Sequence, residues 1–376
     1  MSGPPVVWIL VRDLSRTGVP IVLERLLAAV PDAAGSVHVV AVHGGPLGAR
    51  VRRRCGSVTL LEPTGRRSFP DAAAVGLMVL GLDSWGAKVR RTAWARKVRT
   101  LPPPDVVVLH GAGSWLARSV VPDDVPTVVH LHELQTGLER SIPEDQQRDA
   151  LAGAALVMAV SRPVADLAVQ RGARAREVEI VPGVVDLASS RPAASPGAAL
   201  LEARPVMGAG TPGWRKATDR MVALAHELDR LGRPAAVGWV GGVPAAGEAS
   251  AVASPDPVHW LPELEDPWSV LASTEVIAVP SREDPLPLVA LEAGLHRRPV
   301  VAMPTGGLPD LLADGRGSVA NGHDLRSFCD AVAALLEVPE RAAAMGDALH
   351  AHVVRHHDST VVAARWWSAL VDVASR

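Results

Sequence analysis

The feature that most constrains the fold is a repeated alternation of short apolar runs with helical segments. Continuous runs of Val, Ile and Leu of this length predict parallel strands that are covered by helices on both faces. Helices are expected between them, for example at 19–29 and 163–171. The strands predicted in the first half are 6–12, 37–43, 57–62, 105–111, 126–132, 155–161 and 178–183. We therefore expect an α/β fold with a doubly wound sheet.

A stretch rich in Ala, Ser and Pro, residues 187–204, interrupts this pattern and is predicted to be a linker. The alternation restarts after it with predicted strands at 205–210, 235–242, 275–281 and 298–304 and a helix at 218–231. A chain of 376 residues is too long for one compact core. We expect two Rossmann-like domains, 1–186 and 205–358, that face one another across a cleft. The amphipathic segment 359–376 is expected to form a helix that crosses back to the first domain.

Composition narrows the classes of protein that the chain can belong to. The formal net charge of −2 does not favour a nucleic-acid partner. No apolar run is long enough to span a bilayer, and the first residues lack the basic region of a signal peptide, so we expect a cytoplasmic protein. Cys55 and Cys329 lie far apart in sequence and predict neither a disulfide framework nor a cysteine-based zinc site.

Residues 50–99 form a basic block in which Trp85 and Trp94 are interspersed. Such a block can contact an anionic acceptor or the surface of a membrane. A solvated helix surface in an Arg-rich protein accounts for it equally simply. Both interpretations stay open at the level of sequence.

The stretch "SREDPLPLVALEAG", Ser281–Gly294, places acids on both sides of an apolar run. Asp284 and Glu292, eight residues apart on one helix, would lie about 12 Å apart along its axis and could not share a small ligand. The prolines instead suit a loop and the first turn of a helix. We therefore expect a strand, then an acidic loop, then a helix from about 287 to 296. The carboxyl ends of parallel strands are where open α/β sheets bind ligands.

Together with "RPVVAMPTGGLPDLLADGRG", this stretch resembles the signature of retaining glycosyltransferases of the GT-B fold, family 4 type. That family pairs two acids, separated by seven residues, with a downstream Gly-Gly before a helix. Other segments agree with the family in order along the chain. They are "SRTGVPIVLERLL" (15–27), "VHLHE" (129–133), "VPGVVD" (181–186) and "GAGTPGWRKATD" (208–219). The resemblance extends over nearly the whole chain and implies an acceptor-binding first domain and a donor-binding second domain.

The resemblance implies roles for the acids that fit their chemistry. A carboxylate accepts two hydroxyl hydrogens at once, so Glu292 resembles the family's clamp on the donor ribose. Asp284 takes the place of the acid that contacts hydroxyls of the transferred sugar. The family more often has Glu there, and Glu283 stands beside it, so either carboxylate is a candidate. A surface glutamate and an N-terminal helix cap are the structural alternatives for Glu292 and Asp284.

A diphosphate needs cations and N–H donors. The resemblance implies that Arg215 and Lys216 supply the charge, with Ala217 following where the family usually has Gly. Backbone N–H groups at Leu288 and Val289 would face the anion at the start of a helix. A solvent-facing basic pair is the alternative for Arg215 and Lys216.

Further backbone and side-chain contacts are implied with weaker support from the residues. Gly306 and Gly307 can bind phosphate or merely turn the chain. Thr17 and Gly18 resemble the loop that approaches the β-phosphate, although a plain loop explains them too.

His132, followed by Glu133, matches a family histidine near the donor sugar, and His110 is a poorer candidate at the end of another strand. A structural histidine is the alternative. The segment "VHWLPEL", with Leu261, is expected near the base of the nucleotide.

The resemblance as a whole implies an enzyme that moves a hexose-type sugar from a UDP- or GDP-sugar to an acceptor hydroxyl, with retention of configuration. No D-x-D triplet occurs, and the resemblance implies catalysis with no metal and no cofactor, the nucleotide sugar being a co-substrate. The expected acceptor is a glycan, a lipid-linked molecule or a small molecule, in cell-envelope or natural-product synthesis. The alternatives are a nucleotide-sugar epimerase of the same fold and a non-catalytic binding homologue. A phosphorylase is disfavoured because none of the three lysines stands in a pyridoxal context.

Overall fold

The computed structural model describes residues 3–62, 79, 83–189, 206–232, 235–244 and 257–376. The chain forms two compact units. Unit 1 is Met1–Pro182 with Thr360–Arg376, and unit 2 is Gly183–Ser359. Residues 183–186 therefore belong to unit 2 rather than to the first domain in which we expected them. Most of the predicted linker lies outside the described residues.

Unit 1 is built on a seven-stranded sheet in which every pair of neighbours is parallel. The strand order is β3-β2-β1-β4-β5-β6-β7. The strands are β1 (Val7–Val11), β2 (Val37–His43), β3 (Ser57–Glu62), β4 (Val106–His110), β5 (Thr127–Leu131), β6 (Leu156–Ala159) and β7 (Val178–Ile180). The order reverses at β1, which pairs with β2 on one side and with β4 on the other. All residues of β1 and β4 are buried, which explains their unbroken apolar sequence.

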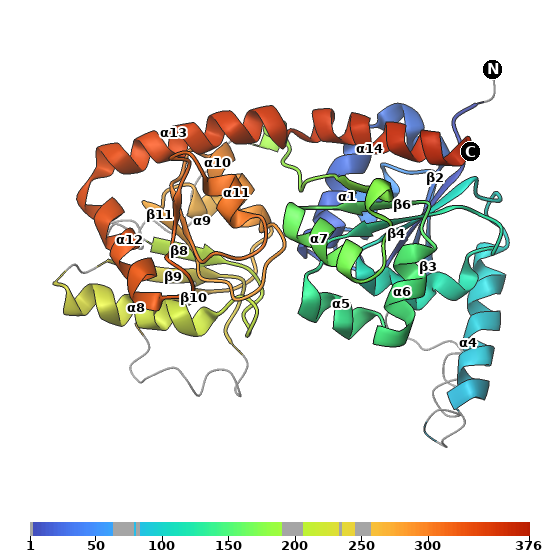
Figure 1. Ribbon diagram of the computed structural model, residues 1–376, viewed down its shortest axis with the longest axis horizontal. Coiled ribbons are helices and arrows are strands. Elements are labelled where there is room, and N and C mark those ends of the chain that lie inside the picture. The colour runs from blue at the N-terminus through green and yellow to red at the C-terminus, as the bar shows by residue number, and fades with distance from the viewer. Residues whose placement is uncertain (1–2, 63–78, 80–82, 190–205, 233–234, 245–256) are drawn as a thin grey trace. The chain divides into compact units, whose positions relative to one another are not determined.

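Helices connect the strands of unit 1 (Figure 1). They are α1 (Gly18–Ala28), α2 (Gly48–Arg52), α4 (Asp83–Val98), α5 (Gln135–Ser141), α6 (Glu144–Ala152), α7 (Arg162–Gln170) and the 3₁₀ segments η1 (Pro31–Ser36), η2 (Ala112–Val120) and η3 (Ala175–Glu177). The final helix, α14 (Ser359–Ala374), is part of this unit. Trp366, Leu370 and Val373 lie on one stripe of α14 and are almost fully buried. The prediction that the C-terminal helix returns to the first domain is confirmed.

Unit 2 repeats the architecture with a six-stranded parallel sheet of order β10-β9-β8-β11-β12-β13. The strands are β8 (Val206–Ala209), β9 (Val237–Val240), β10 (Val258–Leu261), β11 (Val276–Val279), β12 (Val300–Ala302) and β13 (Ser318–Val319). The order reverses at β8, which lies between β9 and β11. Doubly wound sheets in general bind ligands at the carboxyl ends of the strands next to such a reversal.

Helices cover both faces of the second sheet. They are η4 (Leu187–Ser189), α8 (Thr218–Arg230), α9 (Trp268–Leu271), α10 (Leu288–Leu295), α11 (Leu308–Leu312), α12 (Leu325–Glu337) and α13 (Pro339–His356). One apolar core lies under α8 and α12 and a second under α9, α10 and α11 (Figure 1). Neighbouring residues of β11 alternate between them: Ile277 packs in one core and Ala278 in the other.

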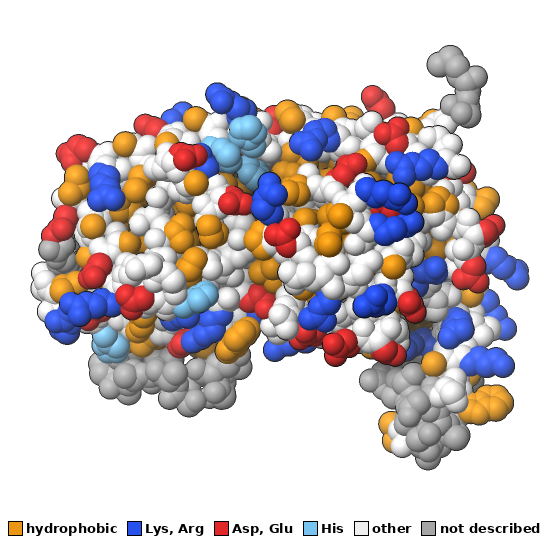
Figure 2. Space-filling view, in the orientation of Figure 1, with side chains coloured by type: hydrophobic (Ala, Val, Ile, Leu, Met, Phe, Trp, Pro, Cys, Tyr) orange, Lys and Arg blue, Asp and Glu red, His pale blue; other side chains and the backbone are white. Residues whose placement is uncertain are grey.

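Residues 63–78 and 80–82 of the basic block 50–99 lie outside the described residues, and the rest of the block is only partly exposed. On the face drawn in Figure 2, Lys and Arg side chains gather over α4, whereas elsewhere acidic and basic side chains are interspersed. Trp85 is 61% exposed and lies beside Lys88. Trp94 is 1% exposed, so our interpretation of it as part of a surface patch is wrong. Among the described residues, no helix combines the length and the apolar character needed to cross a membrane.

The packing of α10 against α13 generates a prediction for Gly346, which lies in the middle of α13. A methyl group added there would collide with the backbone oxygen of Arg297, a residue held in the left-handed region (φ 55°). Helix propensity alone would favour Ala by about 1 kcal/mol. We expect the collision to prevail, so that Gly346→Ala lowers the free energy of unfolding by about 1–3 kcal/mol. Thermal unfolding of the full chain measures this as a fall in Tm of several degrees.

Gly48→Ala in α2 is the matched control. Its added methyl group would find its nearest neighbour at 3.7 Å, an ordinary contact with Leu14. We expect an unchanged or slightly raised Tm for this variant. An unchanged Tm for Gly346→Ala would show that α10 and α13 do not approach as closely as described.

Candidate functional site

The loops that follow β8 and β11 meet at the carboxyl end of the second sheet. The two strands are parallel neighbours, with Val206 opposite Val276 and Met207 opposite Ile277. Their loops are joined through the backbone. The carbonyl oxygen of Arg215 accepts hydrogen bonds from the N–H groups of Arg282, at 2.8 Å, and Glu283, at 3.3 Å. Residues about seventy positions apart in sequence are thereby held together.

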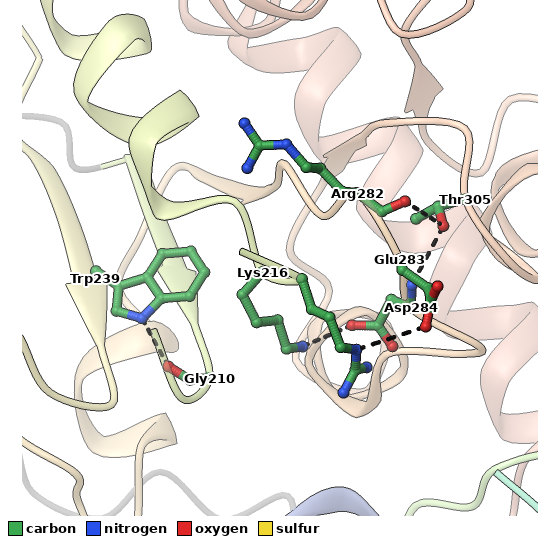
Figure 3. A network of polar contacts seen from close by, with 8 residues as sticks. Gly210, Lys216, Trp239, Arg282, Glu283, Asp284 and Thr305 are labelled. Atoms are coloured by element: carbon green, nitrogen blue, oxygen red, sulfur yellow. Dashed lines mark hydrogen bonds and ion pairs between the residues drawn. The ribbon is translucent and has the colours of Figure 1, made fainter. Parts of the chain in front are cut away.

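A buried ion pair lies at the centre of this junction (Figure 3). The Nζ atom of Lys216 donates to Oδ2 of Asp284 across 2.7 Å, and Asp284 is only 5% exposed. The Lys216 side chain passes over Gly210, where an added Cβ atom would come within 2.8 Å of its Cε atom. A side chain at position 210 would displace Lys216, which gives the glycine turn after β8 a physical reason.

A second ion pair, which sequence reasoning missed, links the same two loops. Arg282 donates two hydrogen bonds to Asp219, at 2.7 and 2.5 Å. These hydrogen bonds lower the pKa of Asp219 from its usual value. The guanidinium of Arg220 donates to the backbone oxygen of Pro280 at 2.8 Å. Arg282 lies in the motif stretch itself, but only the folded chain shows that its partner is at the start of α8.

The second acid of the loop, Glu283, lies beside Arg215. Its Oε1 atom is 4.0 Å from Nε of Arg215, and that nitrogen is buried with no hydrogen-bond partner among the described residues. The two neighbouring acids thus differ in environment. Asp284 is buried and directly bonded to Lys216, whereas Glu283 is half-buried and lies at a longer distance from its cation.

The residue after Lys216 is strained. Ala217 is fully buried and adopts a left-handed conformation (φ 54°, ψ 50°) as it begins α8. This conformation costs an L-residue roughly 1–2 kcal/mol, which Gly avoids. The departure of Ala217 from the Gly of the family pattern therefore carries an energetic cost.

Gly306 and Gly307 support the acidic loop. A Cβ atom on Gly306 would overlap the backbone oxygen of Asp284, and Gly306 has a φ of 53°. The N–H of Gly307 donates to the carbonyl oxygen of Pro285 at 2.8 Å. Thr305 adds a further tie, since its Oγ1 atom accepts from the N–H of Asp284 at 3.2 Å. Only a glycine at position 306 allows this close approach of the two backbones.

Glu292 lies on α10, one turn from its start, and is oriented by a tryptophan. The Nε1 atom of Trp268 donates to Oε2 of Glu292 at 2.8 Å. The Trp268 ring stacks on His296, with centroids 4.4 Å apart and an interplanar angle of 12°. No sequence pattern singled out Trp268, because it contacts Glu292 only through the packing of α9 on α10.

The N-terminus of α10 directly follows the acidic loop of this junction. The helix begins at Leu288 after the extended residue Pro287, and no side chain caps it. The first N–H groups of a helix, here those of Leu288 and Val289, have no partner within the helix and carry the positive end of its dipole. Leu261 ends β10, where its carbonyl oxygen accepts from the N–H groups of Gly241 and Gly242 at 3.2 and 2.8 Å.

The other predicted site residues belong to unit 1. Thr17 and Gly18 are exposed at the start of α1, and Oγ1 of Thr17 lies 2.9 Å from Oγ of Ser15. His132 follows β5. The carboxylate of Glu133 accepts from the N–H groups of His132 and Ala112, each at 2.9 Å, and so fixes the strand end.

His132 is one of three histidines in contact. Its ring centroid lies 4.5 Å from that of His110 and 4.2 Å from that of His130. Burial lowers the pKa of all three rings, that of His110 to about 4 and those of His130 and His132 well below 6.5, and the neighbouring histidines lower the latter two further. The rings are therefore neutral at pH 7. Sequence reasoning gave His110 little weight, yet the structure places it beside His132.

The junction in unit 2 combines complementary groups. It holds a carboxylate fixed by Trp268, two basic residues paired with acids and an uncapped helix N-terminus. A carboxylate binds vicinal hydroxyl groups, while cations and helix N–H groups bind phosphate. The arrangement can therefore hold a ligand that carries both.

Two family models match the chain. Residues 16–189 match Glycosyltransferase Family 4, and residues 207–338 match Glycosyl transferases group 1. The first match covers most of unit 1 and ends in the first residues of unit 2, and the second lies within unit 2. The second contains both loops of the junction and α10.

Related proteins match a shorter part of the chain. A D-inositol 3-phosphate glycosyltransferase of Catenulispora acidiphila is 39% identical over 105 residues, which are 28% of this chain and 23% of the relative. That of Mycobacterium avium is 40% identical over 99 residues, 25% of this chain and 23% of the relative. The chain thus aligns with about a quarter of the length of these curated relatives.

Solved structures match nearly the whole length of this chain. HepE of Anabaena, in complex with UDP and glucose, has a TM-score of 0.73 at 16% identity and covers 97% of this chain and 99% of its own. Sucrose-phosphate synthase of Thermosynechococcus elongatus has a TM-score of 0.73 at 16% identity, with 99% of each chain covered. The chain belongs to the family 4 glycosyltransferases of group 1 and has their GT-B fold.

Proposed function

We propose that the chain transfers a hexose-type sugar from a UDP- or GDP-sugar to an acceptor hydroxyl group. The observation that carries the proposal is the junction in unit 2, where Glu292, the Lys216–Asp284 pair and the start of α10 follow neighbouring strands. In the proposed complex Glu292 accepts both hydroxyl hydrogens of the ribose, and the diphosphate lies against Lys216 and the α10 N-terminus. Leu261 lies toward the base.

In the proposed reaction the bond between C1 of the sugar and the β-phosphate oxygen breaks. The acceptor oxygen bonds to C1 from the same face, and its proton passes to the departing phosphate oxygen, so that configuration is retained. Lys216 and Arg215 stabilise the charge that develops on the leaving diphosphate. An ammonium has three N–H donors, so contact with Asp284 leaves Lys216 able to contact phosphate as well.

The Lys216–Asp284 and Arg215–Glu283 pairs are the basis on which we propose a reaction that needs neither metal nor cofactor. Carboxylates that bind Mg²⁺ must be open to it, whereas Asp284 is buried against Lys216 and Glu283 faces Arg215. Because Asp284 is tied to Lys216, we propose Glu283 as well as Asp284 for contacts with the sugar hydroxyls. Gly307 already donates its N–H to Pro285, so we propose a packing role for it.

We propose that unit 1 supplies the acceptor side. In this proposal Thr17 and Gly18 approach the β-phosphate and His132 contacts the donor sugar as a neutral ring. The names of the relatives, D-inositol 3-phosphate glycosyltransferases, and of HepE bound to UDP and glucose support a UDP-sugar and a polyhydroxylated acceptor. A glycan, a lipid-linked molecule and a small molecule all fit this class, and the basic α4 with exposed Trp85 is the surface we propose for an anionic acceptor or membrane.

Calorimetric titration of UDP, GDP, TDP and ADP into the full chain tests the role of Glu292. We expect one nucleotide to bind, and Glu292→Ala to weaken it by about 10- to 100-fold, since hydrogen bonds to a charged group contribute about 1.5–3 kcal/mol. Trp268→Phe keeps the ring stacked on His296 but removes the donor that orients Glu292, so a smaller loss is expected.

Glu340→Gln, an exposed change on α13, is the control and should leave binding unchanged. If no nucleotide binds, the proposal of a nucleotide-sugar enzyme is wrong. If Glu292→Ala binds as tightly as the parent chain, Glu292 does not hold the ribose.

The Lys216–Asp284 pair gives a second test, which separates stability from binding. Lys216→Met leaves a buried carboxylate without a partner and should destabilise the chain by about 3–5 kcal/mol. The double change Lys216→Met with Asp284→Asn removes both charges and should restore most of that stability. UDP should still bind at least tenfold more weakly to the double variant, because the cation is missing.

Arg230→Met, which breaks the exposed pair with Glu227, is the matched control and should barely change the Tm. Thermal unfolding measures the stability of these variants, and calorimetry measures their affinity for UDP. A double variant that binds UDP like the parent chain would show that Lys216 acts only in folding.

A further inference from the structure

Three histidines meet at the carboxyl end of the first sheet. His110 ends β4 and lies directly opposite His130 of β5, and His132 follows two positions later on the same side of the chain. Each ring offers a nitrogen, and these nitrogens all lie within 4.8 Å of one another. Among the residues that the structure describes, no other group of His, Cys, Asp or Glu is arranged to hold a metal ion.

The nitrogens of this cluster are buried and largely unpaired. His110 and His130 are 1% and 0% exposed. Nδ1 of His110, both ring nitrogens of His130 and Nε2 of His132 have no hydrogen-bond partner within the described parts of the chain. A buried polar atom without a partner costs roughly 1–3 kcal/mol, and four in one place call for an occupant.

The backbone already orients the His110 ring as it does around metal-bound histidines. Nε2 of His110 lies 3.2 Å from the carbonyl oxygen of Val19, so this nitrogen is the one that carries the proton and Nδ1 keeps its lone pair. Histidines that ligate a metal usually donate their second N–H to a backbone carbonyl or a carboxylate.

We infer that His110, His130 and His132 bind a divalent transition metal ion such as Zn²⁺, through one ring nitrogen of each. This site lies within unit 1 and shares His132 with the proposed function, but the observations that carry it are those of the histidine cluster alone. Neutral imidazole is the form that ligates metals, and a set of three suits Zn²⁺, Ni²⁺ or Cu²⁺ rather than Mg²⁺.

The geometry needs only a small adjustment. Zn²⁺ binds imidazole nitrogen at about 2.0–2.1 Å, which places the nitrogens of a tetrahedral site about 3.4 Å apart. The separations in the cluster, up to 4.8 Å, exceed this by at most about 1.4 Å. Rotation of the rings closes the difference, since the outer torsion of histidine is broad. His132 is the least buried of the three and leaves a side open for a fourth ligand such as water.

The direct test is titration of Zn²⁺ and Co²⁺ into the full chain without an affinity tag. We expect one ion per chain by calorimetry, and a visible Co²⁺ spectrum of a nitrogen-ligated site that Zn²⁺ abolishes. His110→Gln and His130→Asn should each weaken Zn²⁺ binding at least tenfold. His323→Gln, an exposed histidine of unit 2, is the matched control and should change nothing.

A measurement on the unaltered chain covers the case in which a buried variant fails to fold. The electron paramagnetic resonance spectrum of the Cu²⁺ form should show splitting from three nitrogen nuclei. A Co²⁺ spectrum of the free aqueous ion, a Cu²⁺ spectrum without nitrogen splitting, or Zn²⁺ binding that survives His130→Asn in a folded chain would each overturn the inference. The cluster would then be a stack of neutral histidines bridged by water.

Discussion

The buried pair of Lys216 and Asp284 is the interaction on which the second unit's site depends. It joins the loops after β8 and β11 at the point where the strand order reverses, and loss of either partner would leave a buried charge unpaired. The surrounding contacts serve the same junction: Gly210 makes room for the Lys216 side chain, and Gly306 lets its loop lie on the backbone of Asp284. A site of this kind is ordered before any ligand arrives, which lowers the cost of binding.

The two units have the same doubly wound topology but carry different side chains at the carboxyl ends of their strands. Both sheets are parallel, and in both the loops that can bind a ligand follow the two central strands. In unit 2 these loops carry paired charges and an uncapped helix N-terminus. In unit 1 a neutral histidine cluster lies at the ends of β4 and β5, next to the reversal at β1. The two proposed sites differ because the side chains that follow the strands decide what each can bind.

The sequence predicts the strands well, because a strand buried on both faces must be apolar throughout. The predicted strand 37–43 coincides with β2, in which only the last residue, His43, is not buried. The predicted strand 57–62 also coincides with β3, which is mostly half-buried because it lies at the edge of the sheet. The sequence also predicts the acidic loop and α10, because Pro and Gly residues mark the ends of helices and strands. It could not predict β13, which has two residues, or the contact of Trp268 with Glu292.

Contacts between separate elements depend on register and packing, which a single sequence does not encode locally. The histidine cluster is an example, because His110 meets His130 only through the pairing of β4 with β5. A crystal structure of the full chain with UDP tests the central claim most directly. We predict the diphosphate within hydrogen-bonding distance of Lys216 and the N–H groups that begin α10, with the ribose on Glu292. UDP bound away from the junction of the β8 and β11 loops would contradict the account.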